Sequence, residues 1–328
     1  MPKSDPNPLS EFDLIARFFS PPAAQGFVGV GDDCGIMPVR PGFQLAVSTD
    51  TLIEGRHFFS DADPADIGHK ALAVNLSDLA AAGAQLRACL LSLSLPHADE
   101  SWLQAFSQGF LSLANESGCQ LIGGDTTRSH DKIILGVTVL GEVPVSQALL
   151  RGRAQPDDDI WVTGQLGAPH TALQLRQGVW AADEALLAQT LPRLLRPQPP
   201  VHWAPELLGH AHAAIDISDG LIQDLQHILH DSQFGARVEA AAIPQHPALT
   251  HLSAEQQLEA VLSGGDEFEL CFTAPVAQRA HILDSAAKAG VAVQRIGTIT
   301  LEPTLQILDF EGKALNAEPT GFDHFNRS

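Results

Sequence analysis

The stretch HKALAVNLSDLAAAGA, residues 69–84, predicts a helix in which one carboxylate, Asp78, stands among alanines and leucines. Asn75 lies one turn earlier on the same helical face. No arginine or lysine stands three or four residues from Asp78, and an unpaired carboxylate is costly to bury in an apolar helix. Asp78 is therefore predicted to bind a ligand or a metal ion.

The elements around this helix predict an α+β arrangement. Asp63-Pro64 opens the helix, because proline is favoured at the first helical position, and Gly83 ends it. Strands and helices alternate on both sides of it, as in mixed sheets with helices on one face. The other helices predicted in this half are one opened by Ser10 and Asp13, with Phe12, Ile15, Ala16 and Phe19 on one side, and one that contains Trp102, Phe106, Phe110 and Leu113 and ends at Gly118. The predicted strands are at 27–31, 43–48, 87–95, 120–123 and 132–141.

A second half begins near Leu149 and reads as an α/β sandwich. The chain has 328 residues, more than one core usually serves, so two domains are expected at 1–148 and 149–328. The elements predicted in the second half are a strand at 159–163, a helix opened by Gly167, an extended proline-rich connector at 191–205, a helix opened by Asp219-Gly220, a strand at 268–273, a helix at 277–289 and a strand at 291–299.

Charge and composition narrow the class of protein. The formal net charge is −20, whereas nucleic-acid binding depends on clustered lysine and arginine. The N-terminal segment lacks signal-peptide character, and no run of about 18 apolar residues predicts a membrane helix. The four cysteines form no CxxC pair. We therefore expect a cytoplasmic protein with reduced thiols, no nucleic-acid partner and no membrane contact.

Several aspartates stand at the ends of predicted strands, beside glycine or serine. Such positions let backbone and carboxylates approach a ligand closely. Each aspartate alone has a simpler interpretation as a turn or a helix cap, as for Asp219 before Gly220. Together they form an oxygen-rich set suited to Mg²⁺. These aspartates are Asp32, Asp33, Asp50, Asp125, Asp216, Asp219 and Asp266.

An acidic site can bind a polyphosphate when Mg²⁺ lies between the two anions. The sequence contains no GxxxxGK[ST] motif, no HRDxxxxN or DFG motif, and no GxGxxG after Gly29. A P-loop, a protein-kinase fold and a Rossmann fingerprint are therefore excluded.

In motif order and spacing, the chain resembles the thiamine-monophosphate kinases, a branch of the ATP-dependent group that includes aminoimidazole ribonucleotide synthetase and selenophosphate synthetase. The resemblance extends along nearly the whole chain. The motifs that carry it are GVGDDC, VSTDTLIEGRHF, HKALAVNLSDLAAAGA, LIGGDTTR, IDISDGLIQDL, LSGGDEFELCF and GFDHF.

The resemblance implies a homodimer whose N-terminal sheets pair across the dimer axis, and an enzyme that converts thiamine monophosphate to thiamine pyrophosphate, the last step of thiamine pyrophosphate biosynthesis. ATP is the implied co-substrate, with several Mg²⁺ ions. The implied ATP contacts are Gly124, Asp125, Arg151 and Ser218. The implied substrate contacts are His57, Asp266, Glu267 and Phe322. The implied Mg²⁺ ligands are Asp33, Ser48, Thr49, Asp50, Asp78, Asp125, Asp216 and Asp219.

The chain departs from the family at one acidic motif. The family usually reads GGED followed by an aromatic residue, whereas this chain reads Asp266-Glu267-Phe268 and has no tyrosine. Either Asp266 or Glu267 could contact the substrate. Asp32, next to Asp33, could bind Mg²⁺ directly, through water or through a neighbouring ligand.

The implied reaction needs no general base. The acceptor phosphate monoester has a second pKa of about 6 and is mostly a dianion at neutral pH. Direct in-line transfer of the γ-phosphoryl group is expected, with metal ions offsetting the repulsion between the anions. The alternatives are another ATP-dependent synthetase of the same group and a non-catalytic sensor of Mg²⁺ and nucleotide.

Overall fold

The computed structural model describes residues 10–315 and confirms an α+β fold. Contacts divide the chain into two compact units. The first runs from the start of the described chain to Pro41 and includes Val47–Asn75 and Leu86–Gly141. The second comprises Gly42–Ala46, Leu76–Gln85 and the chain from Glu142 onward. The predicted boundary between residues 148 and 149 stays a prediction.

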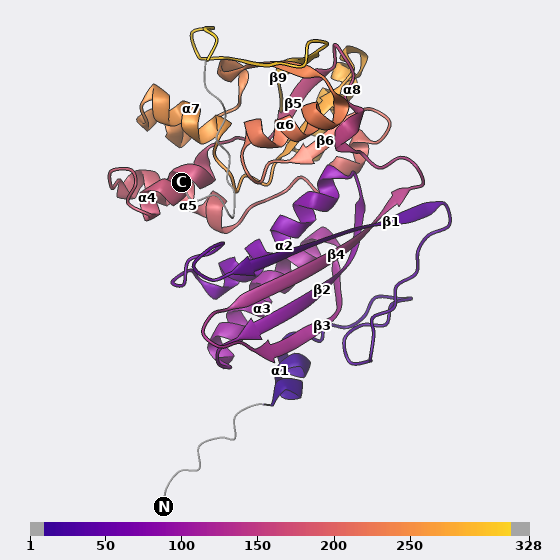
Figure 1. Ribbon diagram of the computed structural model, residues 1–328. Helices are drawn as coiled ribbons and strands as arrows, with labels where there is room; N and C mark the ends of the chain where they lie inside the picture. The colour runs from indigo at the N-terminus through magenta and orange to yellow at the C-terminus, as the bar shows by residue number, and fades with distance from the viewer. Residues whose placement is uncertain (1–9, 316–328) are drawn as a thin grey trace, which may run out of the picture. The chain divides into compact units, whose positions relative to one another are not determined.

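A four-stranded sheet has the strand order β1-β4-β2-β3, and helices α2 and α3 cover one face of it (Figure 1). Strand β1 is at one edge of this sheet, and β2 pairs with β3 in parallel. The elements are α1 (Glu11–Phe18), β1 (Phe43–Ile53), α2 (Pro64–Ala81), β2 (Gln85–Leu95), α3 (Glu100–Ser117), β3 (Gln120–Arg128) and β4 (Ile134–Pro144).

Two glycines let α2 and α3 approach closely. A Cβ atom at Gly68 would lie 2.1 Å from the carbonyl oxygen of Phe106, and one at Gly109 would lie 1.9 Å from that of Ala65. Phe106 and Phe110 are fully buried and stack with ring centroids 6.2 Å apart. This contact fixes α2, which carries Asn75 and Asp78.

A six-stranded sheet has the strand order β10-β7-β9-β5-β8-β6. Antiparallel pairs join β7 to β9, β9 to β5, β5 to β8 and β8 to β6, and β10 pairs with β7 in parallel. The strands are β5 (Asp159–Thr163), β6 (Ala213–Asp216), β7 (Gly235–Glu239), β8 (Leu270–Ala274), β9 (Val293–Thr300) and β10 (Leu305–Leu308). The α-helices of this part of the chain are α4 (Ala168–Arg176), α5 (Glu184–Leu195), α6 (Leu221–Ser232), α7 (Ala254–Leu262) and α8 (Arg279–Ala289). The short 3-10 helices are η1 (Arg151–Arg153), η2 (Ala204–Leu207), η3 (Ala240–Ala242), η4 (Pro247–His251) and η5 (Val276–Gln278).

Both faces of the six-stranded sheet are apolar and covered. One core contains Ile160 and Ile215 of the sheet with Leu225 of α6 and Val261 of α7. The other contains Phe272 of β8 with the buried Trp203 and with residues of η2 and α8. Continuous burial along β5, β6 and β8 follows from this arrangement. It matches the α/β sandwich expected for the second half.

Several predicted elements are confirmed. Helix α2 begins at Pro64, α3 ends at Gly118, and β5 has the predicted bounds. Gly167 and Gly220 are the N-caps of α4 and α6. Ser10 and Asp13 form the predicted capping box of α1.

Other predicted elements are wrong. Residues 27–31 form no strand and have isolated bridges such as Val28 with Ile36. Helix α5 takes in Pro192 from the predicted connector, because Leu186 and Leu194 bury one side of it. On α1 the buried residues are Leu14 and Phe18, while Phe12 is 79% exposed. Within residues 10–315, no helix is long and apolar enough to cross a membrane.

Candidate functional site

Ser48, Thr49 and Asp50 lie within β1, which extends to Ile53, so Asp50 does not follow the end of a strand as predicted. Side chains alternate along a strand. Ser48 and Asp50 are accordingly half-buried on one face, and Thr49 is exposed on the other. The Thr49 hydroxyl lies 3.1 Å from the Val137 carbonyl oxygen and 2.9 Å from the Thr138 hydroxyl of β4. The Thr49 hydroxyl therefore already makes hydrogen bonds within the sheet.

Asn75 of α2 fixes the position of Asp50. The backbone N–H of Asp50 donates to Asn75 Oδ1 at 2.9 Å, and Asn75 Nδ2 donates to the Ala71 carbonyl oxygen at 3.1 Å. Asn75 is fully buried. Sequence analysis noted this residue beside Asp78 but assigned it no role, because its partner lies 25 residues away on another element.

His57 lies in a tight turn after β1. The backbone N–H of His57 donates to the Ile53 carbonyl oxygen, and the N–H of Ile53 donates to His57 Nδ1 at 2.9 Å. Because Nδ1 accepts, a neutral ring carries its proton on Nε2. In this tautomer Nε2 is the hydrogen-bond donor of the His57 ring.

Gly124 and Asp125 lie within β3 and just past a bulge. Cys89 pairs with Leu121 but Leu90 pairs with Gly123, so Ile122 is an extra residue. Gly124 has φ +154°, and a Cβ atom there would lie 1.9 Å from the Leu91 carbonyl oxygen. Only glycine fits this position. Asp125, directly after it, is exposed.

Asp32 and Asp33 lie in an exposed loop and not at the end of a strand, which corrects the prediction. The loop contains a bridge between Val30 and Asp32, and Asp32 Oδ1 accepts the N–H of Asp33 at 2.8 Å. Asp32 therefore shapes the loop that presents Asp33.

Asp216, the last residue of β6, is the most perturbed carboxyl with a resolved value. Burial, the charge of Asp78 and the charge of Asp224 raise its pKa to about 8. Asp216 is 5% exposed, and Asp78 is half-buried. Asp78 and Asp216, two of the predicted Mg²⁺ ligands, thus lie close enough in the second unit for the charge of Asp78 to act on Asp216, and a cation would relieve this repulsion.

The loop after β6 carries Ser218 and Asp219, both half-buried. Its backbone N–H groups point at Asp224 of α6, which sequence analysis did not select. Oδ2 of Asp224 accepts from Ser218 at 2.9 Å, from Asp219 at 3.1 Å and from Gly220 at 3.2 Å. The available sequence signal was an aspartate in the first turn of a helix, which usually indicates only a favourable helix dipole.

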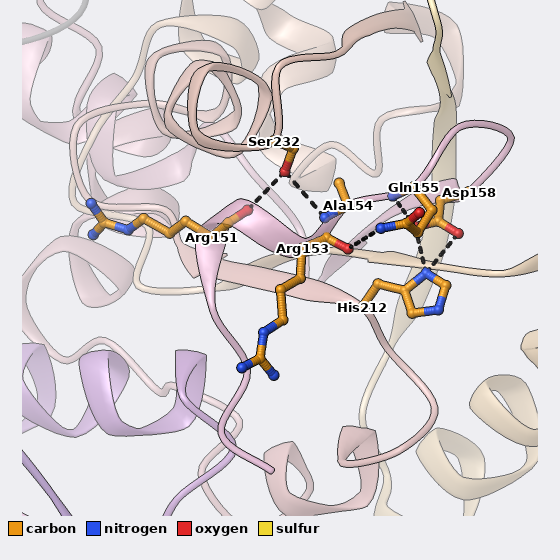
Figure 2. Close-up of polar contacts among 7 residues, drawn as sticks. All are labelled: Arg151, Arg153, Ala154, Gln155, Asp158, His212 and Ser232. Carbon is orange, nitrogen blue, oxygen red and sulfur yellow. Dashed lines mark hydrogen bonds and ion pairs between the residues drawn. The ribbon is translucent and has the colours of Figure 1, made fainter. Parts of the chain in front are cut away.

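Arg151 is the first residue of the 3-10 helix η1. Ser232, at the C-terminal end of α6, makes hydrogen bonds that fix the position of η1. Ser232 Oγ donates to the Arg151 carbonyl oxygen at 3.2 Å and accepts the Ala154 N–H at 3.1 Å (Figure 2). In Figure 2 the side chains of Arg151 and Arg153 point in different directions. The charge of Arg151 acts to lower the pKa of Asp216, which opposes the effect of burial. Arg151 therefore lies within electrostatic reach of that carboxyl.

A second polar network holds the segment that carries Arg151 (Figure 2). Asp158 Oδ2 accepts the Gln155 N–H at 2.9 Å and lies 2.8 Å from His212 Nδ1. Asp158 is 2% exposed. This buried carboxylate ties the chain after η1 to the residue before β6.

The acidic pair Asp266-Glu267 divides into two environments. Asp266 is half-buried in a left-handed conformation with φ +63°. Glu267 is 3% exposed, and its Oε1 accepts the N–H of Gly167, the N-cap of α4, at 2.6 Å. Glu267 Oε2 is buried and has no hydrogen-bond partner, and burial raises the pKa of Glu267 well above its ordinary value.

Glu269 continues this acidic segment and was not selected from the sequence. Its Oε2 accepts from the Thr163 hydroxyl at 2.6 Å, and its Oε1 accepts from Arg193 at 2.7 Å. Glu269 and Arg193 line a pocket of about 560 Å³ together with His246 and the chain from Gln198 to Trp203. No residue predicted for the site lines this pocket, so we assign it no substrate.

The donor chemistry fits a hard cation, although within the described chain no three His, Cys, Asp or Glu side chains form a metal cluster. The charge of Asp78 helps to raise the pKa of Asp216, so the two carboxyl groups lie near each other. Carboxylate oxygens are what Mg²⁺ prefers, and it commonly uses one or two of them with water and phosphate. Phe322 lies outside the described residues.

Comparisons with known proteins identify the family. Residues 31–143 match the family described as AIR synthase related protein, N-terminal domain, and residues 155–309 match its C-terminal domain. The chain is 42% identical over 320 residues to a thiamine-monophosphate kinase of Escherichia coli (strain K12), covering 96% of this chain and 98% of that protein. The chain belongs to the thiamine-monophosphate kinase family.

Solved structures of the thiamine-monophosphate kinase family have the same fold. The crystal structure of the thiamine-monophosphate kinase from Stenotrophomonas maltophilia K279a matches with a TM-score of 0.82 at 43% identity, over 89% of this chain and 93% of that one. The complex of AaThiL with AMPPCP and TMP matches with a TM-score of 0.76 at 27% identity, over 88% of this chain and 89% of that one.

Proposed function

We propose that this chain transfers the γ-phosphoryl group of ATP to thiamine monophosphate, which yields thiamine pyrophosphate and ADP and completes thiamine pyrophosphate synthesis. The observation that carries the proposal is the Asp78–Asp216 carboxyl pair with Arg151 in electrostatic reach, in a chain of this family. An acidic site with one nearby arginine suits a phosphorylated ligand that arrives with metal ions. The AMPPCP and TMP bound by AaThiL are an ATP analogue and a thiamine phosphate in this interpretation.

The proposed magnesium ligands are Asp33, Ser48, Thr49, Asp50, Asp78, Asp125, Asp216 and Asp219. When bound, Mg²⁺ would neutralise phosphate charge and so lower the repulsion between donor and acceptor.

The chain's own groups would orient the two anions. Gly124, Asp125, Arg151 and Ser218 are the proposed ATP contacts. His57 donates to the acceptor phosphate from Nε2, because Nδ1 is used by Ile53. Asp266 is the proposed acidic contact to the substrate, since Glu267 is turned inward to Gly167. Phe322 is proposed to pack on the cationic ring of the substrate.

The acceptor needs no general base, because its phosphate is mostly a dianion at neutral pH. We therefore propose direct in-line transfer without a phosphoenzyme. A phosphorylated side chain found by mass spectrometry after incubation with ATP alone would contradict this mechanism.

A homodimer and a cytoplasmic location complete the proposal. Strand β1 is at a sheet edge and exposes Leu45 by 44% and Val47 by 60%. Exposed apolar side chains on an edge strand favour pairing with another copy. All four cysteines are free, which suits a reducing compartment.

A product assay tests the proposed function. Purified protein is incubated with ATP, Mg²⁺ and thiamine monophosphate, and the thiamine phosphates are separated by chromatography. We expect thiamine pyrophosphate to form, and to be lost with EDTA and in Asp50→Asn. Asp131→Asn, an exposed aspartate of the same unit, serves as the matched control. ATP binding without any product would contradict the proposal and favour a sensor or a synthetase with another acceptor.

A further inference from the structure

Three backbone N–H groups in succession converge on one carboxylate oxygen in the second unit. The donors are Ser218, Asp219 and Gly220, at 2.9, 3.1 and 3.2 Å from Asp224 Oδ2. Asp224 is 3% exposed. A buried carboxylate that accepts several backbone N–H groups holds the loop in one conformation, because leaving those donors unpaired would be costly.

The same loop is held from its other side by the segment before β8. The Asp266 N–H donates to the Ser218 carbonyl oxygen, and the Phe268 N–H donates to that of Ile217, both at 2.8 Å. A Cβ atom at Gly265 would lie 2.5 Å from the Ser218 carbonyl oxygen. The two carbonyls thus face one segment while the three N–H groups face Asp224.

A cap role alone does not account for Asp224. Gly220 is the N-cap of α6 and has no side chain to offer. A usual N-cap side chain accepts from the second or third helical residue, whereas Asp224 reaches back to Ser218 and Asp219, outside the helix. Asp224 therefore defines the path of the loop between β6 and α6.

We propose that Asp224 is a positioning residue that sets the geometry of Ser218 and Asp219 for binding of magnesium nucleotide, without itself touching the metal ion. The inference rests on the proposed function, because Ser218 and Asp219 are the proposed contacts to ATP and Mg²⁺. Residues that orient the ligands of a metal typically change metal affinity by about 10- to 100-fold when substituted.

Two variants and one control test the proposal. Asp224→Asn keeps an oxygen acceptor and the size of the side chain, whereas Asp224→Ala removes the acceptor. Asp231→Asn alters an exposed aspartate at the end of the same helix and is the control. The measurements are hydrogen exchange of the Ser218–Gly220 amides, calorimetric binding of magnesium ATP, and the Mg²⁺ dependence of turnover.

We expect faster exchange at these amides and an Mg²⁺ requirement raised about 10-fold or more in Asp224→Ala, with Asp224→Asn in between. At saturating Mg²⁺ the kcat and the KM for the acceptor should stay near the wild-type values, and Asp231→Asn should match the wild type throughout. An effect on turnover alone, with unchanged exchange and unchanged nucleotide binding, would contradict a positioning role.

The outcomes separate this inference from the proposed function. A wild-type protein that binds magnesium ATP but makes no thiamine pyrophosphate would refute the proposed acceptor, while exchange and calorimetry would still decide the role of Asp224. If Asp224→Ala does not fold, Asp224→Asn decides. A folded Asp224→Asn with the wild-type Mg²⁺ requirement would overturn the inference, and so would a wild type that binds no magnesium ATP.

Discussion

The environment of Glu267 links a single side chain to the pH dependence of stability. In the unfolded chain its pKa is near 4.5, and in the folded protein burial raises it well above that value. The folded state therefore binds more protons than the unfolded state above about pH 4.5, so the free energy of unfolding falls as pH rises. The fall ends once pH exceeds the raised pKa.

Glu267→Gln should flatten this dependence. Glutamine does not titrate, and its amide oxygen can keep the hydrogen bond from Gly167. Between about pH 5 and about pH 8 the variant should lose less unfolding free energy than the wild type, as measured by urea titration. Some slope should remain, because burial also raises the pKa of Glu269. Glu255→Gln, at an exposed glutamate, is the control. Equal slopes of unfolding free energy against pH for Glu267→Gln and the wild type would contradict the raised pKa of Glu267.

Asn75→Ala should destabilise the first unit. The substitution leaves the Asp50 N–H without its acceptor, and a buried unpaired donor costs about 1–3 kcal/mol. Chemical denaturation measures this loss. Asn115→Ala, on the exposed side of α3, is the control and should stay within about 0.5 kcal/mol of the wild type. A loss no larger than in the control would mean that water replaces the side chain.

At the scale of an element, the bulge in β3 depends on Gly124. Gly124→Ala would force a Cβ atom against the Leu91 backbone at a φ of +154°. We expect a loss of about 3 kcal/mol or more, from strain and overpacking together. Gly118→Ala has φ +69° and nothing within 4 Å, so it should cost about 1–2 kcal/mol from strain alone. Equal losses in thermal unfolding would show that the close approach at Gly124 is unimportant.

The helices show what local sequence can predict. The start of α2, the end of α3 and the start of α6 follow from Pro64, Gly118 and Gly220, which act within their own turn of chain. Helix α5 was partly misread because its burial against other elements outweighs the local preference of Pro192. Short strands such as β6, with four residues, carry too few positions for a periodic signal.

The candidate site also contains residues that could be selected from the sequence and residues that could not. Asp78 could be selected because a carboxylate in an apolar helix is visible in the sequence itself, and Asp216 because it stands near Ser218 at the end of an element. Asn75 and Asp224 could not be assigned, because they act on backbone N–H groups whose positions depend on the folded chain. The path of β1 through Asp50 was missed for a related reason, since pairing with β4 extends the strand past the predicted end.

At the scale of the whole molecule, the exposed edge strand β1 predicts a homodimer. A single added charge on this strand should prevent the dimer from forming. Val47→Lys places an ammonium group on the exposed apolar side of β1, and lysine on an edge strand opposes pairing. We expect a dimer for the wild type and a monomer for the variant in analytical ultracentrifugation. Val179→Lys, at a residue 65% exposed outside the sheets, should remain dimeric. A dimer that survives Val47→Lys would place the interface elsewhere.

The extra residue in β3 also limits how this gene can change in length. Leu121 and Ile122 are both buried, and the bulge interrupts the alternation of side chains along β3 at this point. Deleting Ile122 would remove the bulge, while Gly123–Arg128 would keep their present partners on β2 and Asp125 would keep its face. Gain of one further residue in the paired part of β3 would instead shift the register by one and turn the later side chains, Asp125 included, to the opposite face. Such a gain should therefore be far less tolerated than most substitutions at Ile122, whereas the loops around Gly42 and Gly312 could vary in length.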